Sequence, residues 1–504
     1  MKNRTDRATA YDDLPYPSFT FPQTNPDRLS TLAILHGLTP VPPSKCRYLE
    51  LGCGDGTNIA YSASIFRDSE FFGIDLSTRH IDRARETSSV LELNNTQFEA
   101  VDILDLNANE LGEFDYVVAH GLFSWVPDSV RDRILELMRD CLTENGIGYI
   151  SYNTYPGCYV RKIGWDLFGQ MSKDVDDPMK KVASAKSVLS IIGSAAAEGS
   201  FQRSLYDEIE SDLTGKNISN IFHDDLADLN HPYYFLEFAR LIDNHGLRYV
   251  CEADPASFEE ITDPELAKEL ASLTDDPLQR EQYRDFIDLT KFRMSVFCKN
   301  TNPPTNAVLP EAIRRTYAIT PLRSVSDTST LVDTQSARFA STDGRSIKVN
   351  HPLTKSVLAS LEQVVPTCLS ELVPDSGTEA ATTLEFLLKL YKARLLSLFT
   401  VPLSTHWIVE ERPRVHKFAR WQAANGCDCM TSLLGVNIGF SSELVRAMVS
   451  LLDGTRDSRS VVNDLVERLG IEEKDRAEAL GKLPGIVDSN LQSFAELGLL
   501  TEQE

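Results

Sequence analysis

The sequence contains no long hydrophobic run and has a deficit of basic charge. No apolar stretch reaches the about 18 residues that a membrane-spanning helix needs, and the first residues are polar, without the apolar region of a secretory signal. The 504 residues carry 50 basic and 74 acidic side chains, a net charge of −24. The sequence therefore argues against membrane insertion, and its charge disfavours binding to nucleic acid or to anionic lipid.

Cysteine is scarce and irregularly spaced. The nine cysteines form no disulfide framework, so we expect reduced thiols and a cytoplasmic location. Only Cys427 and Cys429 stand close together, and without a second Cys or His pair they favour two packed thiols over a metal ion. His223, Asp224 and His231 match no standard ligand spacing either, and favour a helix cap among packed aromatic residues. We expect no metal site.

The length predicts three or four folding units. Residues 11–43 are rich in proline and aromatic residues, which favours an extended strap, and a soft linker at 300–305 marks a boundary. The expected units are an N-terminal strap or lid at 1–44, an α/β unit at 45–160, a mainly helical unit at 161–300, a winged-helix-like module at 305–400 and an accessory unit at 401–504.

Short apolar runs alternate with amphipathic stretches between residues 47 and 152. The runs that we expect to be strands are 48–51, 71–75, 98–101, 114–118 and 147–151, and Asp128 is expected to cap a helix that ends near Cys141. This alternation is typical of a Rossmann-like, doubly wound α/β sheet. In such a sheet, ligands bind at the carboxyl ends of the strands.

The carboxy-terminal part combines a hairpin with helices. Residues 338–349 alternate in polarity around Asp343-Gly344, which predicts a hairpin, and helices are expected at 352–362, 382–398, 442–452 and 459–468. This order suggests winged-helix-like modules. Because the segment has no basic stripe, it favours protein docking or homodimer formation over DNA binding.

A glycine-rich loop follows the first expected strand. Gly52, Gly54 and Gly56 alternate in the pattern G-x-G-x-G, whereas a dinucleotide-binding loop would place its third glycine at the position of Thr57. Such an open turn lets a ligand approach the backbone without meeting side chains. Glu50, just before the loop, suits a ligand that carries an ammonium group.

Two acidic residues follow the next two strands. Asp75 stands 23 residues after Gly52, where its carboxylate can accept hydrogen bonds from both ribose hydroxyls. Asp102 and Ile103 offer an acceptor for an exocyclic amine and an apolar face for a purine. Together with the glycine loop, they predict S-adenosylmethionine as the cofactor better than two helix caps explain them. The expected cofactor-binding residues are Glu50, Gly52, Cys53, Gly54, Asp55, Gly56, Asn58, Asp75, Leu76, Asp102, Ile103 and His120.

The ends of the fourth and fifth strands carry candidates for the chemical step. His120 suits a general base, but an orienting or packed histidine is the more frequent role, and Trp125 suits either a pocket wall or a core. Tyr152 and Asn153 could face the acceptor, and Tyr16 of the strap could line its pocket. These five residues are our candidate catalytic set.

Several segments together resemble the rickettsial-type protein lysine methyltransferases. The similar segments are 11–18, 21–24, 50–56, 120–127, 151–154, 280–286, 411–413, 419–422 and 451–457. The family consists of class I S-adenosylmethionine-dependent enzymes that have a methyltransferase regulatory domain after the catalytic fold. The resemblance covers nearly the whole chain, although Asn25 and Thr57 depart from the usual histidine and glycine.

The resemblance implies methyl transfer to lysine side chains of a protein substrate, with the middle domain covering the acceptor cleft. Two alternatives stay open: a methyltransferase that acts on a small molecule or another side chain, and a cofactor-binding regulator without turnover. Residues 45–300 carry 25 basic and 45 acidic side chains. This excess of negative charge could steer a lysine-rich surface toward the catalytic unit.

Overall fold

The structure is a computed structural model. It describes residue 14 and residues 19–172, 175, 177–254, 264–305, 307–325, 335–362 and 365–502. All nine cysteines lie within these ranges as free thiols. In the part of the chain that is described, no helix is both long and apolar enough to cross a membrane.

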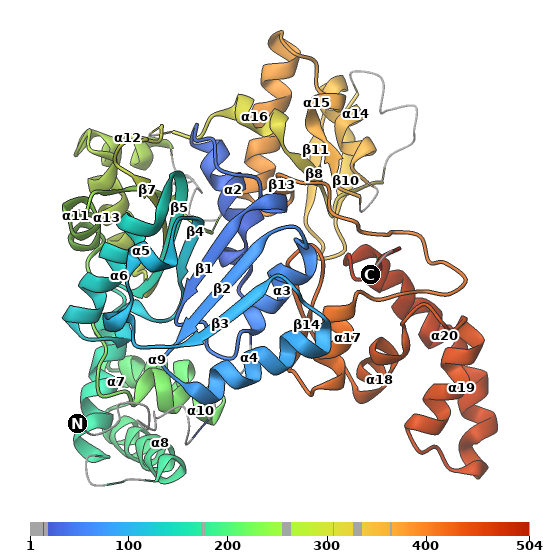
Figure 1. The fold of residues 1–504 in the computed structure, drawn as a ribbon, viewed down its shortest axis with the longest axis horizontal. Coiled ribbons are helices and arrows are strands. Elements are labelled where there is room, and N and C mark those ends of the chain that lie inside the picture. Colours follow the sequence, from blue (N-terminus) through green and yellow to red (C-terminus); the bar gives the residue numbers. More distant parts are fainter. Residues whose placement is uncertain are drawn as a thin grey trace.

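A seven-stranded sheet forms the centre of the molecule (Figure 1), with the strand order β3-β2-β1-β4-β5-β7-β6. The strands are β1 Arg47–Leu51, β2 Glu70–Asp75, β3 Thr96–Ala100, β4 Phe114–Ala119, β5 Leu142–Asn153, β6 Leu247–Glu252 and β7 Phe292–Lys299. Strands β1 to β5 run parallel, and β7 is antiparallel to both of its neighbours. The predicted doubly wound sheet is confirmed.

The last two strands come from the segment that we expected to be mainly helical. It is mainly helical, with α7 Cys158–Met171, α8 Pro178–Ala195, α9 Phe201–Thr214, α10 Ile218–Asn220, α11 Phe235–Asn244, α12 Pro264–Ser272 and α13 Pro277–Asp288. Strand β7 nevertheless pairs with β5 along seven residues, from Ile147↔Cys298 to Asn153↔Phe292. The central sheet therefore extends beyond residue 160.

Helices cover both faces of the sheet. Helices α2 Pro26–Leu35, α3 Thr57–Ile65 and α4 Thr78–Leu91 pack on one face, and α5 Ala108–Leu111, α6 Asp128–Cys141 and α11 pack on the other. Successive residues of a strand point to opposite faces, so Tyr48 joins the first core and Leu49 the second. Helix α6 has the predicted extent, but the capping position belongs to Pro127, and Asp128 is the first helical residue.

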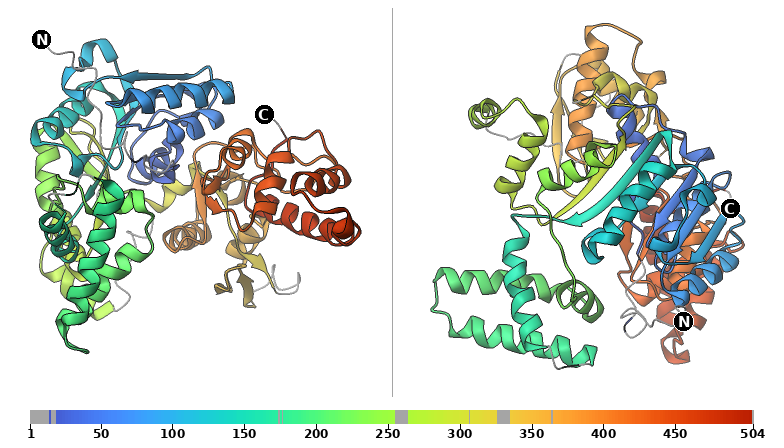
Figure 2. Two further views of the ribbon diagram at one scale, coloured as in Figure 1. Left: turned by 90° about the horizontal axis from the view of Figure 1, so that it is seen from below. Right: turned by 60° about the vertical axis from the view of Figure 1, so that its left-hand side comes forward.

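Helices α7, α8 and α9 project from the sheet and share a small core of their own (Figure 2). Lys291, which directly precedes β7, links this bundle to the sheet. Its Nζ lies 3.0 Å from a carboxylate oxygen of Glu208 and 3.3 Å from one of Asp212, both in α9. The bundle is therefore attached beside the end of β5, where β7 begins.

Two further cores follow in the chain. The first contains η8 Pro310–Arg315, β8 Tyr317–Ile319, β9 Arg323–Ser324, β10 Ala337–Ala340, β11 Ser346–Val349, α14 Pro352–Ser360, β12 Thr367–Cys368, α15 Leu369–Leu372, α16 Thr378–Lys392 and β13 Ser397–Phe399. The second contains α17 Lys417–Ala424, β14 Cys429–Thr431, β15 Asn437–Gly439, α18 Glu443–Leu451, α19 Ser458–Arg468 and α20 Glu473–Glu496. The hairpin predicted around Gly344 is confirmed as β10 and β11.

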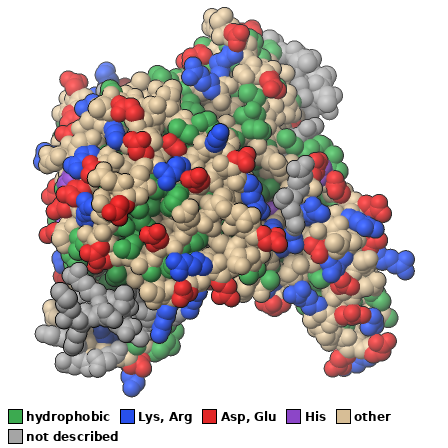
Figure 3. Space-filling view, in the orientation of Figure 1, with side chains coloured by type: hydrophobic (Ala, Val, Ile, Leu, Met, Phe, Trp, Pro, Cys, Tyr) green, Lys and Arg blue, Asp and Glu red, His purple; other side chains and the backbone are tan. Residues whose placement is uncertain are grey.

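Acidic and basic side chains are interspersed over the face shown in Figure 3. Neither sign forms a continuous stripe across the sheet or the carboxy-terminal helices in this view. The excess of negative charge is therefore spread over this face rather than gathered at one point.

Candidate active site

The glycine loop between β1 and α3 has the geometry of a ligand cradle. Gly52, Gly54 and Gly56 have φ values of +75°, +55° and +72°, in the left-handed region that favours glycine. A Cβ on Gly56 would lie 2.6 Å from Ala84 and 2.9 Å from Phe98, whereas a Cβ on Gly54 would meet nothing within 4 Å. Gly56 is therefore required for packing, and the backbone of Gly54 is open to a ligand.

Asp75 is held against this loop by backbone donors. Its Oδ2 accepts a hydrogen bond from the Gly54 N–H and its Oδ1 accepts one from the Ser77 N–H, each at 2.9 Å. His80 Nδ1 lies 3.6 Å from Oδ1, and this carboxylate raises the pKa of His80. Each carboxylate oxygen keeps a second lone pair, so Asp75 is oriented to accept from two hydroxyl groups.

Glu50 is a buried carboxyl at the end of β1. Only 3% of the residue is exposed, and Asn58 Nδ2 donates to both carboxylate oxygens at 3.1 and 3.0 Å. Burial raises the pKa of Glu50 to about 8; the hydrogen bonds from Asn58 oppose this shift, and the charge of Asp75 adds to it. An ammonium group beside Glu50 would offset the cost of burying its charge.

The adenine-side candidates lie at the ends of β2 and β3. Leu76 is 53% exposed and Ile103 is half-buried, so both offer apolar surface. Asp102 Oδ1 accepts a hydrogen bond from the Leu104 N–H at 3.0 Å, which caps the short helix η4, Ile103–Asp105. Asp102 is thus a helix cap that still has a second carboxylate oxygen for a ligand.

Two residues of the loop offer less than their side chains suggest. Cys53 is buried, and its Sγ lies against the side of β2, 2.8 Å from where a Cβ on Gly73 would stand. It therefore offers a ligand only its backbone. Asp55 Oδ1 accepts a hydrogen bond from the N–H of Thr57, the first residue of α3.

His120 directly follows β4, which pairs with β1, the strand that leads into the glycine loop. Desolvation lowers its pKa to about 3, and its Nδ1 lies 2.9 Å from the Tyr149 hydroxyl. Its ring centroid lies 4.0 Å from that of Phe21 and 6.2 Å from that of Phe292. A pKa this far below neutral makes the imidazole a weak proton acceptor, so an orienting role fits it better than that of a general base.

Asn153 ends β5, and Trp125 lies in the loop that follows β4. Asn153 is buried at the end of β5, where its N–H donates to Ser124 Oγ and its Nδ2 donates to Asn230 Oδ1, both at 2.9 Å. Trp125 is half-buried in the short helix η5, Phe123–Trp125. The amide of Asn153 thus joins the loop after β4 to the loop before α11.

Tyr152 points into the core rather than along the edge of the sheet. It is 1% exposed, its ring stacks on Phe238 of α11 with centroids 4.0 Å apart, and its hydroxyl lies 3.3 Å from Ser295 Oγ. The structure therefore does not bring its hydroxyl together with His120. Tyr16 lies outside the described residues.

Three aromatic residues near His120 were not among our candidates. Phe21 was part of a recognised segment but received no role, and Tyr149 lies one strand away from His120. Phe292 begins β7 opposite Asn153 and is 40% exposed. Phe21 and Tyr149 lie in segments that the sequence singled out, whereas Phe292 had no such signal because β7 was not predicted.

The histidines and acids of the middle segment have protein partners. His223 Nε2 lies 2.6 Å from the Leu14 carbonyl oxygen, and Asp225 forms ion pairs with Arg161 and Lys216. Within the described ranges, one group of three residues brings possible metal-ligand atoms within 4.8 Å of one another: His406, Glu410 and Glu502.

Sequence models of three families match the chain. They are a methyltransferase domain at residues 49–147, a predicted methyltransferase regulatory domain at 217–299 and the C-terminal winged helix domain of PKMT at 411–499. The structure is similar to PKMT2 from Rickettsia typhi, with a TM-score of 0.84 and 26% identity over 96% of this chain and 100% of that chain. PKMT2 in complex with AdoHcy gives a TM-score of 0.83 with 25% identity.

Two proteins of Rickettsia prowazekii are also similar to this chain in sequence. The uncharacterized protein RP028 of Rickettsia prowazekii is 34% identical over 239 residues, which are 47% of this chain and 95% of that protein. The chain belongs to the rickettsial-type protein lysine methyltransferase (PKMT) family. The uncharacterized protein RP789 of the same organism is 32% identical over 291 residues, so the chain spans about half, 52%, of the length of that relative.

S-adenosylmethionine is thus the cofactor of this PKMT-family methyltransferase. The open backbone at Gly54 and the buried Glu50 fit its sulfonium and ammonium end. The winged-helix family match lies in residues 411–499, where we expected an accessory unit. A winged-helix-like module at 305–400 stays a prediction.

Proposed function

We propose that this methyltransferase transfers methyl groups from S-adenosylmethionine to lysine side chains of a protein substrate. The observation that carries the proposal is the extent of the likeness to PKMT2, which covers 96% of the chain. It includes the helical bundle and both carboxy-terminal cores as well as the catalytic sheet. Those accessory parts are the ones expected to select the acceptor.

Each cofactor-binding candidate except His120 has a proposed part in holding the cofactor. Glu50 takes the ammonium group, and the backbone of Gly52 to Gly56 supports the methionine moiety with Asn58 holding Glu50 in place. Asp75 takes the ribose hydroxyls, and Leu76, Asp102 and Ile103 take the adenine. These residues thus offer partners for the ammonium group, the ribose hydroxyls and the adenine of the cofactor.

The acceptor is proposed to enter beside His120, between Phe21, Trp125 and Phe292. Methyl transfer is an in-line displacement, so the protein must mainly align the amine with the methyl group. A lysine with a pKa of about 10.4 has only about one neutral amine in 10³ at pH 7. An aromatic wall removes water from the amine and so favours the neutral, nucleophilic form.

The amine proton is proposed to leave to solvent. His120 has a pKa of about 3 and would bind a proton weakly at neutral pH. Burial raises the pKa of Tyr152, whose hydroxyl contacts Ser295. His120 and Asn153 then act by position: His120 shapes the acceptor wall, and Asn153 holds the loop that carries Trp125. A cytoplasmic location is proposed from the scattered cysteines alone.

The test is incubation with methyl-labelled cofactor and a lysine-rich protein, followed by mass spectrometry of the product. We expect label on lysine Nζ. Label only on a small molecule or on another side chain would support the second methyltransferase reading. Tight cofactor binding in calorimetry, with no label on any acceptor, would support a regulator without turnover.

A further inference from the structure

We propose that the winged-helix domain completes the cofactor site, and that Thr20 is the positioning residue through which it acts. Thr20 belongs to the strap, defined here as residues 19–25, which crosses from the winged-helix domain to the glycine loop. The inference concerns cofactor binding, so it holds whatever the acceptor is.

The strap is fastened to the winged-helix domain by Thr20. Its Oγ1 lies 2.7 Å from Thr431 Oγ1 and donates to Asn437 Oδ1 at 2.6 Å. Asn437 Nδ2 returns a hydrogen bond to the Thr20 carbonyl oxygen at 2.9 Å. Thr20 and Thr431 are 1% and 0% exposed. These contacts join positions more than 400 residues apart in the sequence and fix the strap in direction as well as position.

The anchor is itself rigid. The Thr431 N–H donates to Gln422 Oε1 at 2.7 Å, and Gln422 Nε2 donates back to Thr431 Oγ1 at 3.1 Å. His416 Nε2 lies 2.7 Å from the Thr431 carbonyl oxygen. All three side chains are buried between α17 and β14. The position of Thr431 is therefore set by the fold of the winged-helix domain.

The other end of the strap meets the residues that are proposed to hold the cofactor. The Phe21 N–H donates to Asn58 Oδ1 at 2.8 Å, and Asn58 Nδ2 donates to Thr24 Oγ1 at 2.8 Å. The same amide donates to Glu50. Asn58 is thus shared between the strap and Glu50, so a displaced strap would remove two contacts that orient the Asn58 amide toward the Glu50 carboxylate.

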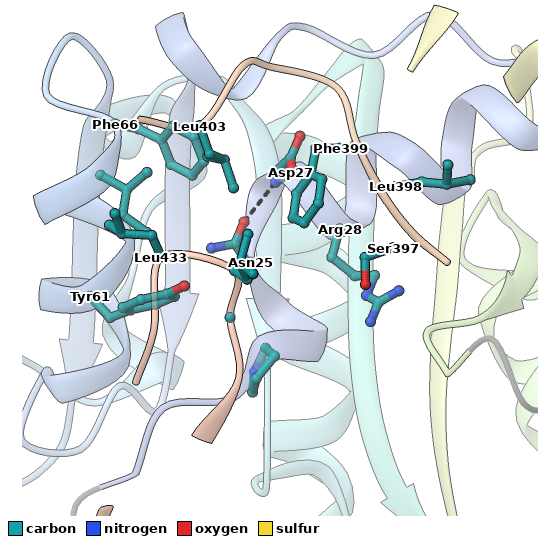
Figure 4. A pocket seen from close by; sticks show the side chains of 14 residues that line it. Asn25, Asp27, Arg28, Tyr61, Phe66, Ser397, Leu398, Phe399, Leu403 and Leu433 are labelled. Atoms are coloured by element: carbon teal, nitrogen blue, oxygen red, sulfur yellow. Dashed lines mark hydrogen bonds between the residues drawn. The ribbon is translucent and has the colours of Figure 1, made fainter. Parts of the chain in front are cut away.

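A second contact holds the winged-helix domain against the same helix. The Tyr61 hydroxyl, on α3, donates to the Ser432 carbonyl oxygen at 2.9 Å. Figure 4 shows Tyr61 beside Leu433, next to the start of α2 at Asn25 and Asp27. Domain and strap therefore contact α3 from two directions, with Asn58 and Tyr61 one turn apart.

The use of hydrogen bonds at this junction argues for positioning rather than for adhesion alone. An apolar contact would hold the two parts together but tolerate sliding, whereas buried hydroxyl and amide groups must keep their partners. When Thr20 keeps its partners, the ring centroid of the next residue, Phe21, stays 4.0 Å from that of His120.

The test compares Thr20→Val with Thr20→Ser in the full chain, with S-adenosylmethionine binding measured by calorimetry in the absence of acceptor. Valine keeps the shape of threonine but removes the hydroxyl. We expect Thr20→Val to raise the dissociation constant about tenfold, because it removes the hydroxyl that contacts Thr431 and Asn437. We expect Thr20→Ser to stay within about twofold of the wild type. With turnover, KM for the cofactor should rise more than kcat falls.

The matched control is Thr383→Val in the preceding module. The Thr383 hydroxyl is also fully buried and lies 3.0 Å from Thr354 Oγ1, in α16 and away from the strap. It should lower the free energy of unfolding without changing cofactor affinity.

The proposal is overturned if Thr20→Val binds the cofactor like the wild type, or if Thr383→Val weakens binding equally. The double variant Thr20→Val with Thr431→Val should weaken binding little more than either single change, because both hydroxyls serve one junction. Full additivity would contradict the shared anchor. Loss of lysine methylation with normal cofactor binding would instead count against the proposed function.

Discussion

At the scale of single residues, Glu50 links cofactor binding to pH. Its pKa of about 8 leaves it mostly protonated at pH 7, so a proton competes with the ammonium group of the cofactor. We expect affinity to rise from pH 6 toward 8 and to fall again as the α-amino group, with a pKa of about 8, loses its own proton. Calorimetry across this range checks it, and Glu50→Gln should bind weakly without the rise.

The same carboxyl predicts an opposite effect on stability. Its folded pKa lies above its unfolded value of 4.5, so its contribution to stability is fully present below pH 4.5 and is lost as pH rises toward 8. Between pH 5 and 8, the free energy of unfolding of the wild type should therefore fall relative to that of Glu50→Gln. Urea titrations at several pH values measure this difference. A constant difference would show that Glu50 is ionised throughout.

Asp75 should be essential for cofactor affinity. Asp75→Ala removes the acceptor for ribose and the partner of the Gly54 N–H, so we expect the dissociation constant to rise at least about tenfold. Asp82→Ala is the matched control, because Asp82 is an exposed carboxylate of α4 that pairs only loosely with Arg85. Equal affinities of the two variants would exclude the ribose assignment.

The proposed cofactor side of the site follows from local sequence patterns more directly than the proposed acceptor side does. Gly52 to Gly56 and Asp75 follow one another in a local pattern whose spacing is fixed by strand and turn geometry. Tyr152 was misleading because nearly all of β5 is buried on both faces, so its pattern does not reveal which side chains face the edge. Burial of the His120 ring likewise depends on Phe21 and Phe292, which no local pattern connects to it.

At the scale of elements, β7 depends on Arg293. This side chain is 4% exposed and pairs with three carboxylates, from Glu252, Glu281 and Asp285. Arg293→Met would leave the buried carboxylates of Glu252 and Asp285 without this cation, so we expect a loss of about 3–5 kcal/mol in the free energy of unfolding. Denaturant unfolding measures it.

The matched control for that change is Arg139→Met. Arg139 is about half exposed and pairs with Asp140 near the end of α6, so its loss should cost less than about 1 kcal/mol. Similar losses for the two arginines would mean that the buried cluster does not stabilise the sheet.

Of the seven strands in the central sheet, β1 to β5 were predictable from the sequence, and β6 and β7 were not. Strands β1 to β5 are short apolar runs separated by helices, and this alternation is visible in the local sequence pattern. Strand β7 finds its partner β5 far back in the chain, and Arg293 interrupts its apolar pattern, so only the folded molecule explains it. Helix α20 also escaped prediction because it contains Pro484 within its 24 residues.

At the scale of the whole molecule, the net charge of −24 predicts salt-sensitive turnover. Added salt screens the attraction between an acidic enzyme and a lysine-rich protein. We expect kcat/KM for the protein acceptor to fall steeply between low and physiological ionic strength, while KM for the cofactor changes little. Initial-rate measurements at several salt concentrations test this, and turnover independent of salt would rule out steering.

The strand order also governs how the chain matures during synthesis. When β5 leaves the ribosome, its outer edge has no partner, because β7 begins 139 residues after Asn153. An open, apolar edge strand invites association with other chains. The newly made amino-terminal third therefore exposes this edge until β7 is synthesised, and a fragment that stops after residue 160 should aggregate rather than bind the cofactor.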